Sequence, residues 1–218
     1  MTNIKDILIK SKNIDILREA GKLGDKLKIS TYLVGGYVRD LLLNKETVDI
    51  DIMVNDQSLS FAKKLSKILG VNKTVDFEKF LTSRIPHNDC EIEIANARIE
   101  SYNDKSRNPE TVIKTTVDKD LSRRDFTINA MAVSLNKETF GELIDSFGGI
   151  ADLNKQVIKT PLNPESTFKD DPLRMIRAIR FAAQLEFEIH DDTKNAIKEN
   201  KQRLKLVSAE RITAEIFK

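Results

Sequence analysis

The chain has 218 residues, 40% of them hydrophobic and 32% charged, as is ordinary for a soluble globular protein. No apolar run is long enough to cross a bilayer and no secretory signal is visible, so we expect a cytoplasmic protein without a membrane partner. The single cysteine, Cys90, cannot form an internal disulfide, and two histidines are too few for a zinc site. The net charge is +2 and neither side of Gly149 is strongly basic, so RNA binding has to be argued from particular residues.

The first half of the chain alternates predicted helices with predicted strands. Apolar residues at helical spacing predict helices over 4–28 and 57–69, and YVRDLLL predicts a short helix after Gly35-Gly36. Alternating or β-branched segments predict strands at 31–34, 48–54, 79–85 and 90–97. The segment His87-Asn88-Asp89 is the expected hairpin turn between the last two.

The second half is predicted to close the sheet and then become helical. Residues 99–118 are polar and contain Pro109, which predicts a mobile loop. FTINAMAVSL and GELID predict a closing pair of strands. Helices are then predicted at 150–154, 172–185, 191–200 and from 208 onward. This order predicts an α+β fold, a mixed sheet with helices followed by an all-helical segment.

An acidic pair lies on the predicted strand 48–54. Asp49 and Asp51 are two residues apart, so on a strand their side chains point to the same face. Carboxylates that close repel each other, and a bound divalent cation such as Mg²⁺ is the usual remedy. CEIEIA carries Glu91 and Glu93 in the same alternation, and one of them completes a two-metal clamp if the strands are neighbours. The simpler interpretation is a solvated strand face, because such pairs are common.

Two glycines, Gly35 and Gly36, separate a predicted strand from a predicted helix, and Arg39 follows them. Glycines let the backbone approach a phosphate, and the amides at a helix start bind anions. A Gly-Gly pair is more often only a tight turn. Here the acidic strand begins soon afterwards, which favours a phosphate site.

The motif LVGGYVRDLLL followed by DIDIMV resembles the opening of the class II CCA-adding enzymes and bacterial poly(A) polymerases. The resemblance continues in the family's order through EIEIANARIESY, DLSRRDFTINAMAV, LIDSFGGIADL, DDPLRMIRAIRFAAQL and SAERITAEIFK. It implies a polymerase-β-like nucleotidyltransferase head over 1–148 and a helical neck over 149–218. The family's body and tail domains lie beyond the position that corresponds to Lys218.

The resemblance also implies roles for single residues. Asp49 and Asp51 match the family's metal-binding, catalytic pair, and Glu93 matches its third acidic position. The positions that match nucleotide contacts are Gly35, Gly36, Arg39, Arg124, Asp125, Asn129, Asp171, Arg174, Arg177 and Arg180.

The segment DDPLRMIRAIRF has two interpretations. Pro172 suits the first turn of a helix, Asp171 suits its cap, and arginines recur every three residues, which is typical of a capped helix with a solvated basic edge. The alternative is base recognition. Asp171 can accept from the exocyclic amino group of cytosine or adenine, and Arg174 can donate to the adjacent ring nitrogen. Uracil and guanine place a carbonyl there, so this pair selects C and A without a nucleic-acid template.

The function that the resemblance implies is addition of C and A from CTP and ATP to the 3′ end of tRNA by two-metal-ion catalysis with Mg²⁺. A CC-adding enzyme, an A-adding enzyme and a poly(A) polymerase share this chemistry. Arg107-Asn108-Pro109 stands where two arginines often precede the proline of a loop associated with the switch from C to A, so the product stays open. Transfer to a small molecule is a third interpretation, and a catalytically incomplete binding module that needs a partner chain is a fourth.

The final segment, SAERITAEIFK, has helical spacing with Ile212, Ile216 and Phe217 on an apolar side. We expect this side to be covered by the neck itself, by a second copy of the chain, or by a partner chain. A near-neutral chain offers few phosphate contacts, so we also expect weak binding of tRNA.

Overall fold

This computed structural model describes residues 2–47, 49–88, 90–103 and 106–218. Side chains are described for all of these residues except those within 100–112. The Cα positions form two compact units. Unit 1 comprises Met1–Ile99, Val112–Asp120 and Met131–Ser146. Unit 2 comprises Glu100–Thr111, Leu121–Ala130 and Phe147–Lys218. The predicted boundary at 148/149 stays a prediction.

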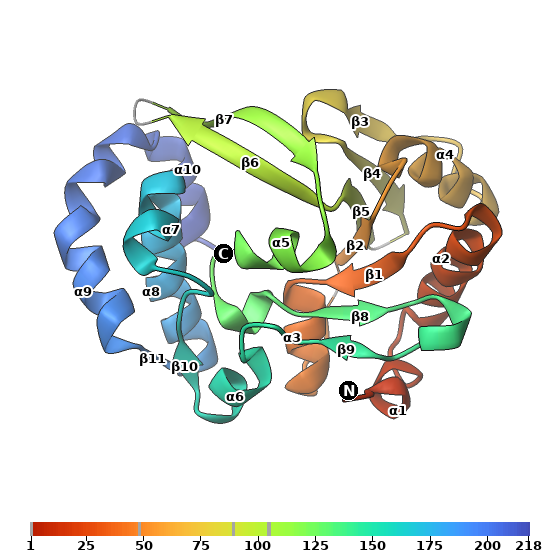
Figure 1. The fold of residues 1–218 in the computed structure, drawn as a ribbon, viewed down its shortest axis with the longest axis horizontal. Helices are drawn as coiled ribbons and strands as arrows, with labels where there is room; N and C mark the ends of the chain where they lie inside the picture. The colour runs from red at the N-terminus through yellow and green to blue at the C-terminus, as the bar shows by residue number, and fades with distance from the viewer. Residues whose placement is uncertain (1, 48, 89, 104–105) are drawn as a thin grey trace. The chain divides into compact units, whose positions relative to one another are not determined.

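Unit 1 is built on a seven-stranded mixed sheet in the order β3-β4-β5-β2-β1-β8-β9 (Figure 1). The strands are β1 (Thr31–Val34), β2 (Ile50–Val54), β3 (Val75–Phe77), β4 (Thr82–His87), β5 (Cys90–Asn96), β8 (Ala132–Ser134) and β9 (Leu143–Ile144). The pair β2–β5 is parallel, whereas every other described pair in this sheet is antiparallel. The parallel pair places the acidic segments predicted from the sequence on adjacent strands.

One face of this sheet is apolar and buried. Ile50 and Ile52 of β2 and Ile92 and Ile94 of β5 are at most 1% exposed, so alternation sends the residues between them to the opposite face. The helices of unit 1 are α1 (Lys5–Leu8), α2 (Ile14–Leu27), α3 (Gly36–Leu42) and α4 (Ser58–Ile68), with the 3₁₀ turns η1 (Glu78–Phe80) and η3 (Lys137–Thr139). The helix α2 contacts β1, α3 contacts β1 and β2, and α4 contacts β4 and β5. Fully buried Phe61 and Leu65 show that α4 inserts apolar side chains into this core.

Unit 2 is mainly helical. Its elements are η2 (Thr127–Asn129), α6 (Gly149–Asn154), β10 (Val157–Ile158), α7 (Pro164–Asp170), α8 (Leu173–Leu185), β11 (Glu188–Ile189), α9 (Asp191–Asn200), η4 (Lys201–Leu206) and α10 (Ala209–Ile216). Phe168, Met175 and Ala196 form a core in which α7 contacts α8 and α9. Phe126 meets Phe181 of α8 edge to face, with ring centroids 5.9 Å apart. The helix α8 therefore lies at the centre of this unit.

The predicted α+β fold is confirmed, and so are most of its elements. The predicted loop 99–118 is wrong. Its residues form most of β6 (Arg98–Asn103) and β7 (Ser106–Lys114), which pair in a two-stranded sheet, and the start of α5 (Val117–Ser122). A two-stranded sheet has only edge strands, and an edge strand tolerates a proline whose missing N–H faces away from the partner. Polar composition therefore did not exclude strands.

The predicted strand FTINAMAVSL is also only partly right. The structure has the 3₁₀ turn η2 at Thr127–Asn129, and β8 begins at Ala132. The cause is the side chain of Asp125, whose Oδ1 accepts from the backbone N–H of Phe126 and from Asn129 Nδ2. Such local side-chain bonds compete with the strand ladder.

Candidate active site

The acidic residues predicted from the sequence meet on one face of the unit 1 sheet. Asp49 lies just before β2 and is exposed, while Asp51 lies within β2 and is half-buried. The parallel register pairs Asp51 with Glu93 of β5. Both residues alternate with buried isoleucines, so both carboxylates project from the face opposite the core. The register thereby singles out Glu93, rather than Glu91, as the partner of Asp51.

This donor set fits a divalent cation by its chemistry. Asp49, Asp51 and Glu93 offer carboxylate oxygens, the ligands that Mg²⁺ takes together with substrate phosphates. Among the described residues, no group of three or more His, Cys, Asp or Glu residues is gathered closely enough to hold a metal ion by itself. An arrangement completed by substrate oxygens is the kind that Mg²⁺ uses in phosphoryl-transfer sites.

An arginine missed by the sequence analysis lies beside the acidic residues. Arg84 of β4 pairs in register with Glu93. Its Nε lies 3.0 Å from Glu93 Oε2, and its Nη1 lies 3.3 Å from Glu91 Oε1. The guanidinium also lies over the ring of Phe77, 5.4 Å from the centroid. The sequence placed Arg84 on a strand, but only the strand order shows which carboxylates it faces.

The glycine pair forms the predicted turn between β1 and α3. Gly35 has φ 72° and ψ −139°, a conformation that essentially only glycine adopts, and it is the N-cap of α3. Arg39 is 9% exposed, and its Nε and Nη2 donate to the two carboxylate oxygens of the adjacent Asp40 at 2.8 and 2.9 Å. If Arg39 binds a phosphate, it must do so with a guanidinium that is already paired with the carboxylate of Asp40.

Asp125 organises the turn of unit 2 that carries three of the predicted nucleotide contacts, Arg124, Asp125 and Asn129. Its Oδ1 accepts from Phe126 N and from Asn129, and its Oδ2 accepts from Arg177 Nε at 2.8 Å and lies 2.6 Å from Arg177 Nη2. Burial alone would raise the pKa of Asp125, but Arg177 and the hydrogen bond from Asn129 outweigh it and hold that pKa below its ordinary value. The carboxylate stays ionised and fixes the turn. Arg124, on the same turn, is half-buried.

The start of α8 carries the predicted base-reading pair. The N-cap of α8 is Pro172, and the residue before it, Asp171, accepts through Oδ1 from the backbone N–H of Leu173 at 3.1 Å, which is the capping hydrogen bond expected of this carboxylate. Arg174 donates through Nη2 to the backbone carbonyl of Arg123 at 2.7 Å and through Nη1 to that of Thr167 at 3.4 Å. Two backbone carbonyls thus orient the guanidinium, while the cap orients the carboxylate.

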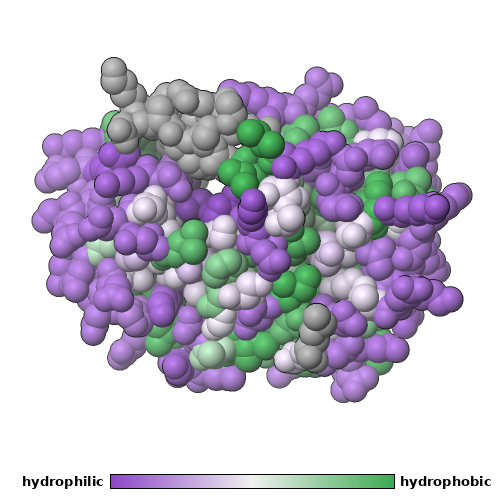
Figure 2. Space-filling model, viewed as in Figure 1, coloured by the Kyte–Doolittle hydropathy of each residue, from purple (hydrophilic) through white to green (hydrophobic). Residues whose placement is uncertain are grey.

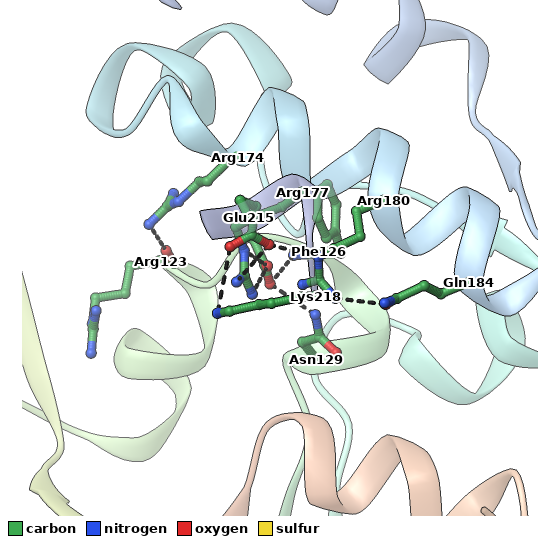
Figure 3. Close-up of polar contacts among 10 residues, drawn as sticks. Arg123, Phe126, Asn129, Arg174, Arg177, Arg180, Gln184, Glu215 and Lys218 are labelled. Carbon is green, nitrogen blue, oxygen red and sulfur yellow. Dashed lines mark hydrogen bonds and ion pairs between the residues drawn. The ribbon is translucent and has the colours of Figure 1, made fainter. Parts of the chain in front are cut away.

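The other two arginines of α8 share a buried glutamate of α10 (Figure 3). Glu215 is 4% exposed, and its Oε1 lies 2.7 Å from Arg180 Nε and 3.5 Å from Arg177 Nη1. Asp125 above all raises the pKa of Arg177, and Glu215 adds to that rise. Arg180 also stacks over Phe181, with 4.1 Å between guanidinium carbon and centroid. Both arginines are ion-paired within unit 2, so the predicted role in nucleotide binding would be additional to a structural role.

Glu215 is not among the site residues predicted from the sequence, although the sequence carries a signal for it. Ile212, Glu215 and Ile216 lie at i, i+3 and i+4, so the glutamate shares the apolar side of the predicted helix. A carboxylate on a buried helix side needs a cationic partner. The basic stripe predicted on α8 provides it.

A hollow of about 740 Å³ in unit 1 is lined by parts of α1, α2 and α3 and by the end of the β4–β5 pair, including Lys10, Tyr37, His87 and Cys90. None of the predicted site residues lines it. The acidic face and this hollow are therefore separate features. Within the described part of the chain, no helix is long and apolar enough to span a bilayer, and the visible face carries mainly hydrophilic side chains (Figure 2).

The sequence matches two known protein families. The family described as "Poly A polymerase head domain" matches residues 31–159, more than half of the chain. The chain belongs to this family. A second family, described as "Probable RNA and SrmB- binding site of polymerase A", matches residues 186–218.

This chain is similar to proteins that are named as A-adding or CCA-adding enzymes. It is 42% identical over 186 residues to an A-adding tRNA nucleotidyltransferase of Geobacter sulfurreducens, covering 85% of this chain and 21% of the relative. It is 39% identical over 204 residues to a CCA-adding enzyme of Enterococcus faecalis, covering 93% and 47%. Among solved structures, it resembles the Thermotoga maritima CCA-adding enzyme complexed with tRNA, with TM-score 0.85, 36% identity and coverage of 98% and 49%.

The chain spans about half the length of the CCA-adding relatives and about a fifth of the A-adding relative from Geobacter sulfurreducens. The similarity to the T. maritima structure bears out the polymerase-β-like head followed by a helical neck. The activity of the longer relatives is a hypothesis for this chain.

Proposed function

We propose that this chain is a template-independent RNA nucleotidyltransferase that adds C and A from CTP and ATP to the 3′ end of tRNA. The observation that carries the proposal is the register of the parallel strands, in which Asp51 of β2 lies beside Glu93 of β5. Both carboxylates lie on the face of the sheet opposite the buried isoleucines of the same strands. Two acidic side chains in that position suit a site for phosphoryl transfer better than a role in core packing.

The reaction is an in-line displacement. The 3′-hydroxyl of the RNA attacks the α-phosphate of the nucleotide, a new phosphodiester bond forms, and pyrophosphate leaves. Asp49, Asp51 and Glu93 would hold the divalent cations, with Mg²⁺ as the proposed metal. When bound, the metal lowers the pKa of the attacking hydroxyl and offsets charge on the leaving group.

Positive charge on the protein assists the same reaction. Gly35 and Gly36 give a phosphate close access to the backbone, and Arg39 and Arg124 are the proposed cationic phosphate contacts. Because such a reaction needs little covalent chemistry from the protein, most of the rate enhancement comes from positioning and electrostatics.

Base choice is assigned to Asp171 and Arg174. Asp171 would accept from the exocyclic amino group of cytosine or adenine, and Arg174 would donate to the neighbouring ring nitrogen. The two carbonyls that hold Arg174 and the capping bond of Asp171 support this, since a fixed pair discriminates better than two mobile side chains.

One experiment tests the function and separates its variants. The chain is incubated with Mg²⁺, each NTP separately, and tRNAs that end at the discriminator base, at C and at CC. We expect CTP to extend the first two and ATP to extend the third. Extension by ATP alone favours an A-adding enzyme, as the Geobacter sulfurreducens relative is named, and long products favour a poly(A) polymerase.

The matched variants are Asp51→Asn and Glu91→Gln. Both remove one negative charge from the same face of the sheet, but only Asp51 pairs in register with Glu93. We expect Asp51→Asn to abolish addition while the fold persists, and Glu91→Gln to retain most of it. Near-normal turnover by Asp51→Asn contradicts the proposal. So does absence of all NTP incorporation by the folded wild-type chain, which supports a binding module that needs a partner.

A further inference from the structure

The acidic face contains a cation that the reaction, as described, does not use. Arg84, Glu93 and Asp51 occupy one register line across three neighbouring strands, β4, β5 and β2. The arginine is thus the next residue beyond the two carboxylates that would hold the divalent cation.

The contacts of Arg84 are specific. Nε lies 3.0 Å from Glu93 Oε2, and Nη1 lies 3.3 Å from Glu91 Oε1, so one planar guanidinium bridges both glutamates of β5. Stacking over Phe77 restricts the guanidinium further. Arg84 donates to Oε2 of Glu93, so Oε1 of the same carboxylate is the oxygen that this hydrogen bond leaves for another ligand.

Stability alone does not account for this arrangement. The side chains of Arg84, Glu91 and Glu93 are 44, 48 and 36% exposed, and ion pairs this exposed contribute little to folding. A fixed cation beside a carboxylate has two larger effects on a metal site: it orients the carboxylate, and it opposes the binding of a second cation.

We propose that Arg84 is a positioning residue that holds Glu93 in line with Asp51 through one carboxylate oxygen and weakens the affinity of the acidic face for divalent cations. This inference rests on the proposed function. Arg84 touches neither substrate nor reacting atoms and acts through Glu93. It keeps the metal exchangeable and the glutamate oriented, so its loss moves metal affinity and turnover in opposite directions.

The test uses the full chain with Mn²⁺ as the probe, titrated by isothermal calorimetry without nucleotide. Removing a unit charge within one side-chain length of a divalent cation in an exposed site strengthens binding by roughly three- to tenfold. We therefore expect Arg84→Ala to bind Mn²⁺ that much more tightly. Turnover at saturating Mn²⁺ should fall, roughly tenfold, with little change in KM for CTP, because Glu93 loses its orientation.

Two further variants separate charge from geometry. Arg84→Lys keeps the charge but cannot bridge two carboxylates, so Mn²⁺ affinity should stay near wild type while turnover recovers only in part. Lys79→Ala removes one positive charge from the neighbouring η1, where the ammonium lies over the ring of Phe80. It should leave affinity and turnover at wild-type values. Thermal unfolding of each variant reports whether the fold is intact.

The inference is overturned if Arg84→Ala binds Mn²⁺ no more tightly than Lys79→Ala does, or if its turnover is unchanged. Its failure can be told from that of the proposed function by Asp51→Asn. If Asp51→Asn loses Mn²⁺ binding and addition while Arg84→Ala behaves as wild type, only this inference fails. If the wild-type chain binds no Mn²⁺ and adds no nucleotide, the proposed function fails with it.

Discussion

At the scale of single residues, Asp125 has a structural role in addition to its predicted role in nucleotide binding. Both of its oxygens are engaged, one by the turn that follows it and one by Arg177 of α8. Asp125 is 7% exposed, and removing one partner of a carboxylate that is buried and paired in this way costs several kcal/mol of stability. Its contribution to stability therefore depends on pH.

Replacement of Asp125 by Asn should lower the free energy of unfolding at pH 7. Breaking a buried ion pair typically costs about 3–5 kcal/mol, but Arg177 is partly exposed and keeps Glu215, so we expect about 2 kcal/mol. The pKa of Asp125 is lowered in the folded state, so this contribution is present above the unfolded-state pKa of about 3.9 and is lost as pH falls from there through the folded-state value.

Urea unfolding at pH 7 and at several lower pH values measures this effect. The difference between wild type and Asp125→Asn should shrink as the pH falls below about 4. Asp191→Asn is the matched control, because that side chain is 90% exposed in the same unit. A difference that stays constant with pH would mean that Asp125 is not ionised in its pair.

Asp171 has two assignments that a pair of variants can separate. Asp171→Ala should lose both the cap of α8, about 1 kcal/mol of stability, and the preference for CTP and ATP over UTP and GTP. A bidentate base contact supplies about 1–3 kcal/mol of discrimination, so that preference should fall roughly 10- to 100-fold.

Asp171→Asn isolates the second assignment, because its side-chain oxygen can still cap α8 while its amide donates where the carboxylate accepted. We expect near-wild-type stability with lost or reversed base preference, measured as kcat/KM for each NTP. Unchanged preference in Asp171→Asn would leave Asp171 as a helix cap only.

At the scale of elements, α10 is joined to α8 by buried charge. Ile216 and Phe217 are 60 and 85% exposed, whereas Glu215 between α10 and α8 is 4% exposed. The apolar side of this helix was expected to be covered by the neck, by a second copy or by a partner chain, but Ile216 and Phe217 are exposed, and the ion pairs between α10 and α8 join Glu215 to Arg177 and Arg180. The apolar residues at its end form an exposed group.

Glu215→Gln should loosen α10 and leave α8 with partly uncompensated arginines. We expect a loss of about 2 kcal/mol in unfolding free energy, because a neutral amide replaces a buried carboxylate that is ion-paired with Arg177, Arg180 and Lys218. Hydrogen exchange should speed up in 209–216 more than in 191–200. Glu210→Gln, an exposed change on the same helix, should do neither. Equal protection of α10 in both variants would mean that packing alone holds the helix.

The elements that could be predicted from the sequence are those whose secondary structure is determined by the pattern of their own side chains. The strand 31–34 and the helices near 173–185 and 191–200 agree with the periodicity of their apolar residues. The helix α7 was missed despite its signals, Asn163 as a cap and Pro164 in the first turn, because its seven residues are mostly polar. The strands β6 and β7 depend on each other, and pairing between segments is not written in either one.

The same distinction applies to the site. Residues that resemble a known motif could be named from the sequence, and the structure places Asp51 and Glu93 side by side. The partners Arg84 and Glu215 could not be named, because the order of strands and the docking of α10 decide what they face. Ion pairs within unit 2 also show that the arginines of α8 are not a solvated stripe.

At the scale of the whole molecule, the charge is nearly balanced and the chain spans about half the length of the CCA-adding relatives. Phosphate contacts supply a large share of RNA affinity, and each one makes binding more sensitive to salt. A chain with a net charge of +2 has few cations in excess. Under the proposed function, the affinity for nucleotides and the affinity for RNA therefore need not be equally strong.

We expect this chain to bind CTP and ATP with ordinary strength and tRNA weakly. Addition should be slow, should fall between 50 and 200 mM salt, and should recover mainly when the RNA concentration is raised. Titration of a tRNA lacking CCA at two salt concentrations, with NTP binding measured in parallel, checks this. Tight, saturable binding by a monomer would point to an RNA surface on α6–α10 or on the β6–β7 pair.

The parallel pairing of β2 with β5 has a consequence for how the protein folds during synthesis. Asp51 and Glu93 are far apart in the chain, and α4, β3 and β4 lie between them. Hairpins such as β4–β5 can close locally within microseconds, whereas a parallel pair must first close a long loop against its entropy. A nascent chain that has only reached β4 therefore carries Asp51 without its neighbour. Under the proposed function, the site for the divalent cation should therefore form only when β5 docks beside β2 at the centre of the sheet.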